Sequence, residues 1–238
     1  MGYYNKDLDD IDFQIIHTND ILKPYIYSYW VVKKHNIDTP ITHKILTDGS
    51  MGVVVNFKSP FTIKVNGNTQ KCTKKFTVNG PTKHLSYISF EKELELIGIR
   101  FKPAGAFIFF DETIDTFEDK HVDLENSHSW KLETLYKCIQ DKESLKDKIT
   151  LIEDFLMKKL ISSKKKNSPW IFHLLEKIHI KKGDIDISSI CKEFNISIRQ
   201  IERKFKQEVG LSPKLYSRII RLRTAKDELS SLKIKNLT

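Results

Sequence analysis

The hydrophobic periodicity of the chain changes after Pro103, and this change most limits what the chain can fold into. Before it, apolar residues alternate with polar ones in "FTIKV" (61–65) and "LELIGIRFK" (94–102), which is the period of a half-buried strand. After it, "ESLKDKITLIEDFLMKKLI" has the period of an amphipathic helix, with apolar positions at Leu145, Ile149, Ile152, Leu156 and Leu160. We therefore expect an α+β fold, β-rich first and helical afterwards.

Turn signals divide the strand region, residues 41–102, into short segments. Asn66-Gly67 separates "FTIKV" from the following "KKFTV" run and predicts a hairpin that joins them. "MGVVVNF" (51–57) follows an Asp48-Gly49 turn and is expected to be buried on both faces. Several short strands at this spacing are typical of a small sandwich or barrel.

The net charge of +9 is concentrated in the last third of the chain. Residues 166–238 hold 16 Lys and Arg against 8 Asp and Glu, whereas residues 1–165 hold 24 against 23. This asymmetry indicates an acidic partner for the last third, nucleic acid first. The alternative is a lysine-rich surface that only keeps the protein in solution.

Four helical segments are expected in that last third. They follow the polar stretch "SSKKKNSP" (162–169), which we interpret as the linker between domains. The second and third segments are short, lie across a tight turn, and the third is basic, which is the outline of a helix-turn-helix. The expected caps and turn residues are Ser168-Pro169, Asp186, Asn195, Ser197, Gly210 and Ser212-Pro213.

The third segment, which begins in "NISIRQIERKFK" (195–206), divides into two faces. Its apolar stripe consists of Ile198, Ile201, Phe205 and Val209, of which Ile198 is expected to be partly exposed. Its charged stripe consists of Arg199, Glu202, Arg203 and Lys206. A solvated helix can show the same pattern, but the capped turn, the basic domain and a small Cys191 at the helix crossing favour a helix that enters a DNA groove.

These residues resemble the first helix-turn-helix of AraC-type (AraC/XylS) transcriptional regulators, from Asp184 to Leu229. The positions that match in order and spacing are Ser197, Ile201, Arg203, Phe205, Gly210, Pro213, Tyr216, Arg221, Ala225 and Leu229. "ILTDGSMGVVVNF" and "LIGIRFKPAGAFIFF" are more weakly similar to the sensor domain of one branch of that family. The resemblance implies a cupin-like barrel or sandwich over 1–110, a helical linker or dimerisation segment over 111–165 and a DNA-binding domain over 166–238.

The resemblance also implies roles in binding double-stranded DNA. The base-reading positions of the family fall on Arg199, Glu202 and Arg203. Arg203 suits guanine, Arg199 suits guanine or a phosphate, and Glu202 accepts from cytosine or repels wrong sequences. Ser197, Lys204 and Lys206 are expected to contact phosphates.

For the N-terminal domain, the resemblance implies effector sensing, dimerisation or both. Trp30, in an aromatic run that starts at Tyr25, is a candidate wall of an effector pocket, and Arg100 a candidate anchor for an anion. The favoured alternatives are core packing for Trp30 and an internal salt bridge for Arg100. The amphipathic stripe of the helices within 130–160 is the candidate contact of a homodimer.

Other classes of function find little support in the sequence. No closely spaced histidine pair, nucleophile motif or glycine-rich phosphate loop is present, so we expect no metal, no cofactor and no enzymatic activity. Three scattered cysteines and the lack of a signal peptide or a long apolar run favour a cytoplasmic protein without a membrane span.

Family members carry two helix-turn-helix units, and this sequence matches the first unit and the helix that joins them. Only "IKNLT" (234–238) resembles the start of the second. We therefore expect weak, salt-sensitive DNA binding. The alternative is a shortened regulator that binds a ligand or partner chains and reads DNA poorly.

Overall fold

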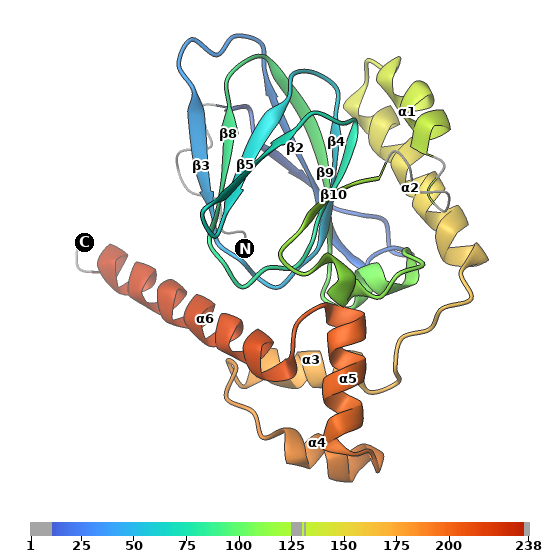
Figure 1. Cartoon of the computed structure of the whole chain (residues 1–238), viewed down its shortest axis with the longest axis vertical. Coiled ribbons are helices and arrows are strands. Elements are labelled where there is room, and N and C mark those ends of the chain that lie inside the picture. The colour runs from blue at the N-terminus through green and yellow to red at the C-terminus, as the bar shows by residue number, and fades with distance from the viewer. Residues whose placement is uncertain (1–10, 125–129, 131, 236–238) are drawn as a thin grey trace.

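The computed structural model describes residues 11–124, 130 and 132–235, and the side chains among them up to residue 230. The expected start of a second helix-turn-helix at residues 236–238 lies outside the described residues. The fold is α+β, as predicted: two antiparallel sheets form a cupin-like sandwich, and helices follow (Figure 1).

The first sheet has six strands and the second has four. The order in the first is β1 (Gln14–Ile16), β2 (Ile26–Lys34), β9 (Leu94–Phe101), β4 (Gly52–Asn56), β7 (Phe76–Asn79) and β10 (His121–Asp123). The order in the second is β3 (Ile41–Ile45), β8 (Ser86–Phe90), β5 (Phe61–Val65) and β6 (Asn68–Cys72). The sheet thus extends past residue 110 as far as Asp123.

Strand β4 is buried on both faces, as its apolar run predicts. Val53 and Val55 belong to a core cluster that includes helical residues, whereas Val54 belongs to the cluster between the sheets. Tyr29 of β2 is likewise fully buried in the first of these clusters. The first sheet therefore packs against helices on one face and against the second sheet on the other.

The Asn66-Gly67 hairpin is present, but its predicted second strand is wrong. β5 pairs with β6, which begins directly after the turn, and the "KKFTV" run instead forms β7 in the other sheet. A two-residue turn places the residues directly after it opposite β5. Residues 68–72 therefore form β6, and the more hydrophobic "KKFTV" run begins only after β6 has ended.

The helices α1 (Leu132–Gln140) and α2 (Leu145–Ser162) cover the first sheet (Figure 1). Their apolar stripe, including Ile149, Ile152 and Leu156, is buried in the same core cluster as β4 and β9. The prediction that this stripe forms a dimer contact is therefore wrong, because packing against the sheet already buries it.

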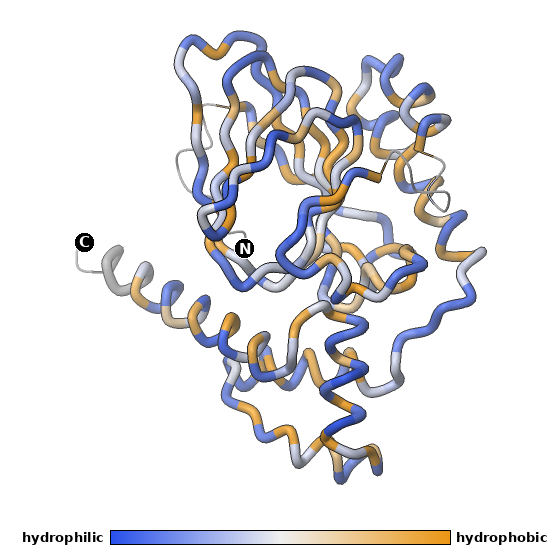
Figure 2. Tube along the Cα trace, viewed as in Figure 1, coloured by the Kyte–Doolittle hydropathy of each residue, from blue (hydrophilic) through white to orange (hydrophobic). Residues whose placement is uncertain are grey.

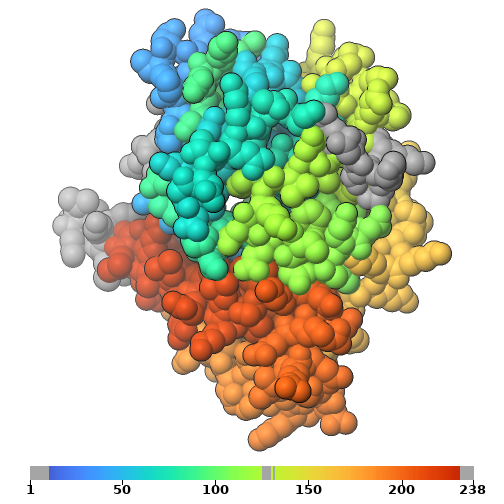
Figure 3. All heavy atoms as spheres, in the orientation of Figure 1, coloured from blue at the N-terminus to red at the C-terminus, as the bar shows by residue number. Residues whose placement is uncertain are grey.

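The C-terminal part of the chain is helical, and two short 3-10 turns of the β-rich part lie beside it. The turns are η2 (Gly105–Ile108) and η3 (Ile114–Phe117), and the helices are α3 (Ile171–Ile180), α4 (Ile187–Phe194), α5 (Ile198–Val209) and α6 (Pro213–Lys235). Ile190, Ile201, Phe205 and Tyr216 form the centre of a separate core, and Ala104 of the β-rich part joins it. In the space-filling view these helices lie directly against the β-rich part (Figure 3).

The linker runs along the surface of the β-rich part and is held there by hydrogen bonds. The Oγ of Ser163 donates to the carbonyl of Ile108 at 2.8 Å, and the Nζ of Lys165 donates to the carbonyls of Phe110 and Glu112 at 2.8 and 2.7 Å. Ser168 does not cap α3, contrary to expectation, since its N–H and hydroxyl donate to the Glu208 carboxylate. Among the described residues, no helix is both long and apolar enough to cross a bilayer.

Candidate functional site

The helices α4 and α5 form a helix-turn-helix with a fully bonded turn. The Asp186 carboxylate caps α4 by accepting from the N–H of Ser188 at 2.9 Å. Asn195 ends α4 in the left-handed region, at φ 49°, where asparagine is one of the few side chains tolerated at low cost. The Ile196 N–H then donates to the Cys191 carbonyl at 3.0 Å.

A capping box fixes the start of α5. Gln200 donates its N–H to the Ser197 Oγ at 3.2 Å, and its side-chain Oε1 accepts from the Ser197 N–H at 3.0 Å. Such reciprocal bonds satisfy N–H groups that a helix start leaves without partners. Ser197 is exposed, but its hydroxyl serves the cap, so its structural task is to set where α5 begins.

The two faces of α5 lie as the sequence predicts. Ile201 and Phe205 are fully buried, and Ile198, at the start, is 53% exposed. Figure 2 shows the corresponding change of hydropathy around the helix. Four charged residues are exposed on the other side, namely Arg199, Glu202, Arg203 and Lys206, and Lys204 is half-buried.

The exposed N-terminal half of α5 points away from the β-rich part. In Figure 1, α5 stands below the sheets, with α4 and the start of α5 at the far end and the end of α5 beside η2 and η3. Arg199, Glu202 and Arg203 thus lie on the part of the helix that is free of the sandwich, whereas Lys206 lies closer to it. Its Nζ is 3.4 Å from a carboxylate oxygen of Glu118, just after η3.

The buried Glu208 was missed by the sequence reasoning. It accepts hydrogen bonds from Asn167 and Ser168 of the linker at 3.0 and 2.9 Å, with only 1% of its surface exposed. The sequence does mark Glu208 as buried, because position 208 lies three residues after Phe205 and seven after Ile201, within the apolar stripe. An acidic residue in such a stripe indicates a polar partner brought from elsewhere in the chain.

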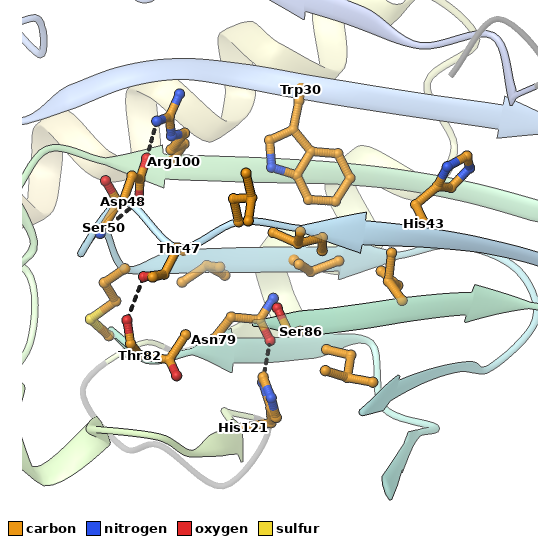
Figure 4. A pocket seen from close by; sticks show the side chains of 18 of the residues that line it. Trp30, His43, Thr47, Asp48, Ser50, Asn79, Thr82, Ser86, Arg100 and His121 are labelled. Atoms are coloured by element: carbon orange, nitrogen blue, oxygen red, sulfur yellow. Dashed lines mark hydrogen bonds and ion pairs between the residues drawn. The ribbon is translucent and has the colours of Figure 1, made fainter. Parts of the chain in front are cut away.

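A partly open cavity of about 270 Å³ lies between the two sheets (Figure 4). Its walls are mainly apolar and come from both sheets, with Trp30, Val54, Ile63, Ile88 and Phe90 among them. Both candidate effector-binding residues, Trp30 and Arg100, line it. The volume is close to the lower end of the roughly 300–1,000 Å³ of small-molecule pockets.

Trp30 owes its position in the cavity to a glycine on the neighbouring strand. Trp30 of β2 is paired with Gly98 of β9, and a Cβ at position 98 would lie 1.8 Å from the Trp30 ring. The indole therefore lies over a backbone position that has no side chain. This explains why a glycine interrupts the apolar run of β9.

Arg100 forms a partly buried internal ion pair at one end of the cavity, as its favoured alternative predicts. Its Nη2 donates to the Asp48 carboxylate (Figure 4). Nη1 of Arg223, from α6, lies 3.6 Å from the same carboxylate. Burial alone would raise the pKa of Asp48, but the two guanidinium groups outweigh it and hold that pKa below its ordinary value. The cavity therefore ends at a charged cluster to which both parts of the chain contribute.

Metal binding finds no support in the described part of the chain, where no group of three or more His, Cys, Asp or Glu side chains is placed to hold an ion. His121 instead forms a hydrogen bond between its Nδ1 and the Asn79 side chain at 2.8 Å. Burial lowers the pKa of His121 below its ordinary value.

Comparisons with known proteins relate the sandwich to one family and the fold to several structures. Residues 14–123 match a domain of unknown function (DUF6597). No curated protein matches the chain. ToxT from Vibrio cholerae is 12% identical, with 84% of this chain and 82% of that chain covered, at a TM-score of 0.44.

Two further structures match a smaller share of the chain. KdgF from Halomonas sp. is 13% identical over 39% of this chain and 79% of its own, with a TM-score of 0.30. Ylba from E. coli is 12% identical over 42% of this chain and 41% of its own, with a TM-score of 0.32. Such low identities and scores carry no conclusion about what this chain does.

Proposed function

We propose that this protein is a sequence-specific DNA-binding transcription regulator of AraC type, in which α5 is the recognition helix. One observation carries the proposal: the capped helix-turn-helix buries one stripe of α5 and leaves a basic stripe exposed on the half that points away from the sandwich. A helix held in this way fits the major groove, where the N-terminal residues of a recognition helix reach base edges.

The exposed residues suit two kinds of contact. Arg203 and Arg199 carry planar guanidinium groups that can bond to both O6 and N7 of guanine, and Glu202 can accept from the amino group of cytosine. Lys204 and Lys206 are suited to phosphates, which position a protein without reading sequence. The N–H and hydroxyl of Ser197 are bonded to Gln200 in the capping box, so Ser197 would have to exchange one of these bonds to contact a phosphate.

The β-rich part is proposed to sense a small molecule in the cavity between its sheets. The mainly apolar walls favour a small, largely apolar effector, with the Trp30 ring as one wall. Arg100 is already paired with Asp48, so any anionic group of an effector would have to share or replace that carboxylate. A change in tryptophan emission that is absent from Trp30→Phe would report binding, since Trp130 and Trp170 emit as well.

A second candidate is an interaction protein that binds partner chains and reads DNA poorly. The observation in its favour is that Leu222 and Leu229 of α6 are 67% and 62% exposed and lie seven residues apart, on one side of the helix. Sedimentation of the chain with and without duplex DNA distinguishes the two: self-association with no effect of DNA would favour this candidate.

The test of the first proposal is a selection from random-sequence duplexes, followed by affinity measurements on the selected site. Arg203→Ala should weaken binding by about 1–3 kcal/mol and relax the preference at one base position. Lys146→Ala, which removes an exposed charge on α2, is the matched control and should change neither. If Arg203→Ala weakened the binding of all DNA sequences equally, a base-reading role for Arg203 would be excluded.

A further inference from the structure

The end of α5 is held against the β-rich part by a close-packed contact. α5 ends at Gly210, where φ is 90° and a Cβ would lie 2.3 Å from Pro81 and 2.9 Å from the Ile114 side chain. Such distances require a residue without a side chain. The recognition helix is therefore packed directly on the segment around η3 and cannot turn freely relative to it.

This contact brings an acidic side chain to the DNA-binding face. The Glu118 carboxylate lies 3.4 Å from the Nζ of Lys206, and the two side chains are 23% and 49% exposed. Lys206 is one of the charged residues of the exposed stripe, so the ammonium that is suited to a DNA phosphate already has an anionic partner. A phosphate on Lys206 would also lie within the screening length of about 8 Å from that carboxylate at physiological salt.

We infer that Glu118 is an inhibitory residue, through which the docked β-rich part competes with DNA phosphate for Lys206. This inference rests on the proposed function and adds to it a way in which one part of the chain controls the other. The contact is weak enough to be displaced, since solvent screens a partly exposed ion pair and little free energy is lost when it breaks. It therefore reduces the affinity for DNA without abolishing it.

The docking surface also reaches the cavity. The loop between β3 and β4 lines the cavity, and the Tyr216 ring lies 2.8 Å from where a Cβ of Gly49 would be. The next contact is Asp48 with Arg223 of α6. An occupant that moves this loop would move the surface on which the C-terminal helices rest, which gives an effector a route to the Glu118–Lys206 pair.

The experiment compares full-length Glu118→Gln with Glu133→Gln, which removes the same charge from another exposed carboxylate paired with a lysine, Lys137 on α1. The probe is a short mixed-sequence DNA duplex, titrated over a series of salt concentrations. Glu118→Gln should bind about two- to five-fold more tightly at low salt. Its slope of log K against log salt should steepen by about 0.9, because Lys206 then releases a counterion on binding.

Two results would overturn the inference, and they are distinguishable. If wild type binds and both variants change affinity and slope equally, the net charge explains the effect and Glu118 has no special role. If no protein binds the duplex at low salt, the proposed function fails and the inference with it. In a Lys206→Gln background, the inference further requires that Glu118→Gln no longer steepens the slope.

Discussion

Trp30 and Gly98 show how one missing side chain places another. The indole lies across β9 only because position 98 has no Cβ, and its ring in turn forms part of the cavity wall. From the sequence, Gly98 in a strand pattern indicates a bulge or a close approach, but not what approaches. The size of the cavity therefore depends on this pair.

At this position we predict that Gly98→Ala displaces the Trp30 ring and lowers the free energy of unfolding by about 1–3 kcal/mol, since the added methyl overpacks the site. Urea unfolding and the tryptophan emission spectrum check this. Gly67→Ala is the control, because a Cβ there meets nothing within 4 Å. That change should cost about 1 kcal/mol for its positive φ and leave the emission unchanged.

At the scale of elements, α5 has three tasks, two of them on its buried face. Its apolar stripe packs in the C-terminal core, its basic stripe is exposed, and the buried Glu208 holds the linker. A carboxylate with so little exposure is stable there because Asn167 and Ser168 satisfy its oxygens. The linker and α5 are thus fixed to each other.

We predict that Glu208→Ala frees the linker. The substitution leaves the N–H of Ser168 without its acceptor and should cost about 1–3 kcal/mol in the free energy of unfolding. A lysine-specific protease should then cut faster at Lys164 to Lys166, as mass spectrometry would detect. Glu202→Ala, on the exposed face of the same helix, should change stability by no more than about 0.5 kcal/mol and leave the cleavage rate unchanged.

The sequence predicts elements better than it predicts their contacts. Local spacing was enough for strands β4, β5 and β9, the capped turn and the two stripes of α5, because these depend on neighbours a few residues away. The pairs Glu118–Lys206 and Asp48–Arg223 join residues far apart in the chain, and no local pattern marks them. The dimer prediction failed for the same reason: an amphipathic stripe does not say what it packs against.

At the scale of the whole molecule, the two parts of the chain are one packed unit. Three kinds of contact join them: the linker bonds at Glu208, the close packing at Gly210, and the ion pairs of Lys206 and Arg223. The Arg223 side chain is only 17% exposed, so its attraction to Asp48 is weakened by solvent less than that of a surface pair.

We predict that acid pH destabilises the packed unit, because Asp48 becomes protonated. Because the pKa of Asp48 is lowered in the folded protein, its ionised form stabilises the fold above the ordinary value of 3.8, and this contribution is lost as the pH falls below it. The free energy of unfolding should therefore fall more steeply from pH 5 to 3 in wild type than in Asp48→Asn. Urea titrations at each pH measure the slopes, and parallel curves would contradict the prediction.

The loop between β3 and β4 has a consequence for how such a protein can diverge. Its residues form a wall of the cavity on one side and carry α6 on the other. A mutation that reshapes the cavity also changes the surface on which the C-terminal helices rest, and must be matched by a change in those helices. The β-rich part is therefore not an interchangeable module, and its exchange between relatives would require both halves of this contact to be inherited together.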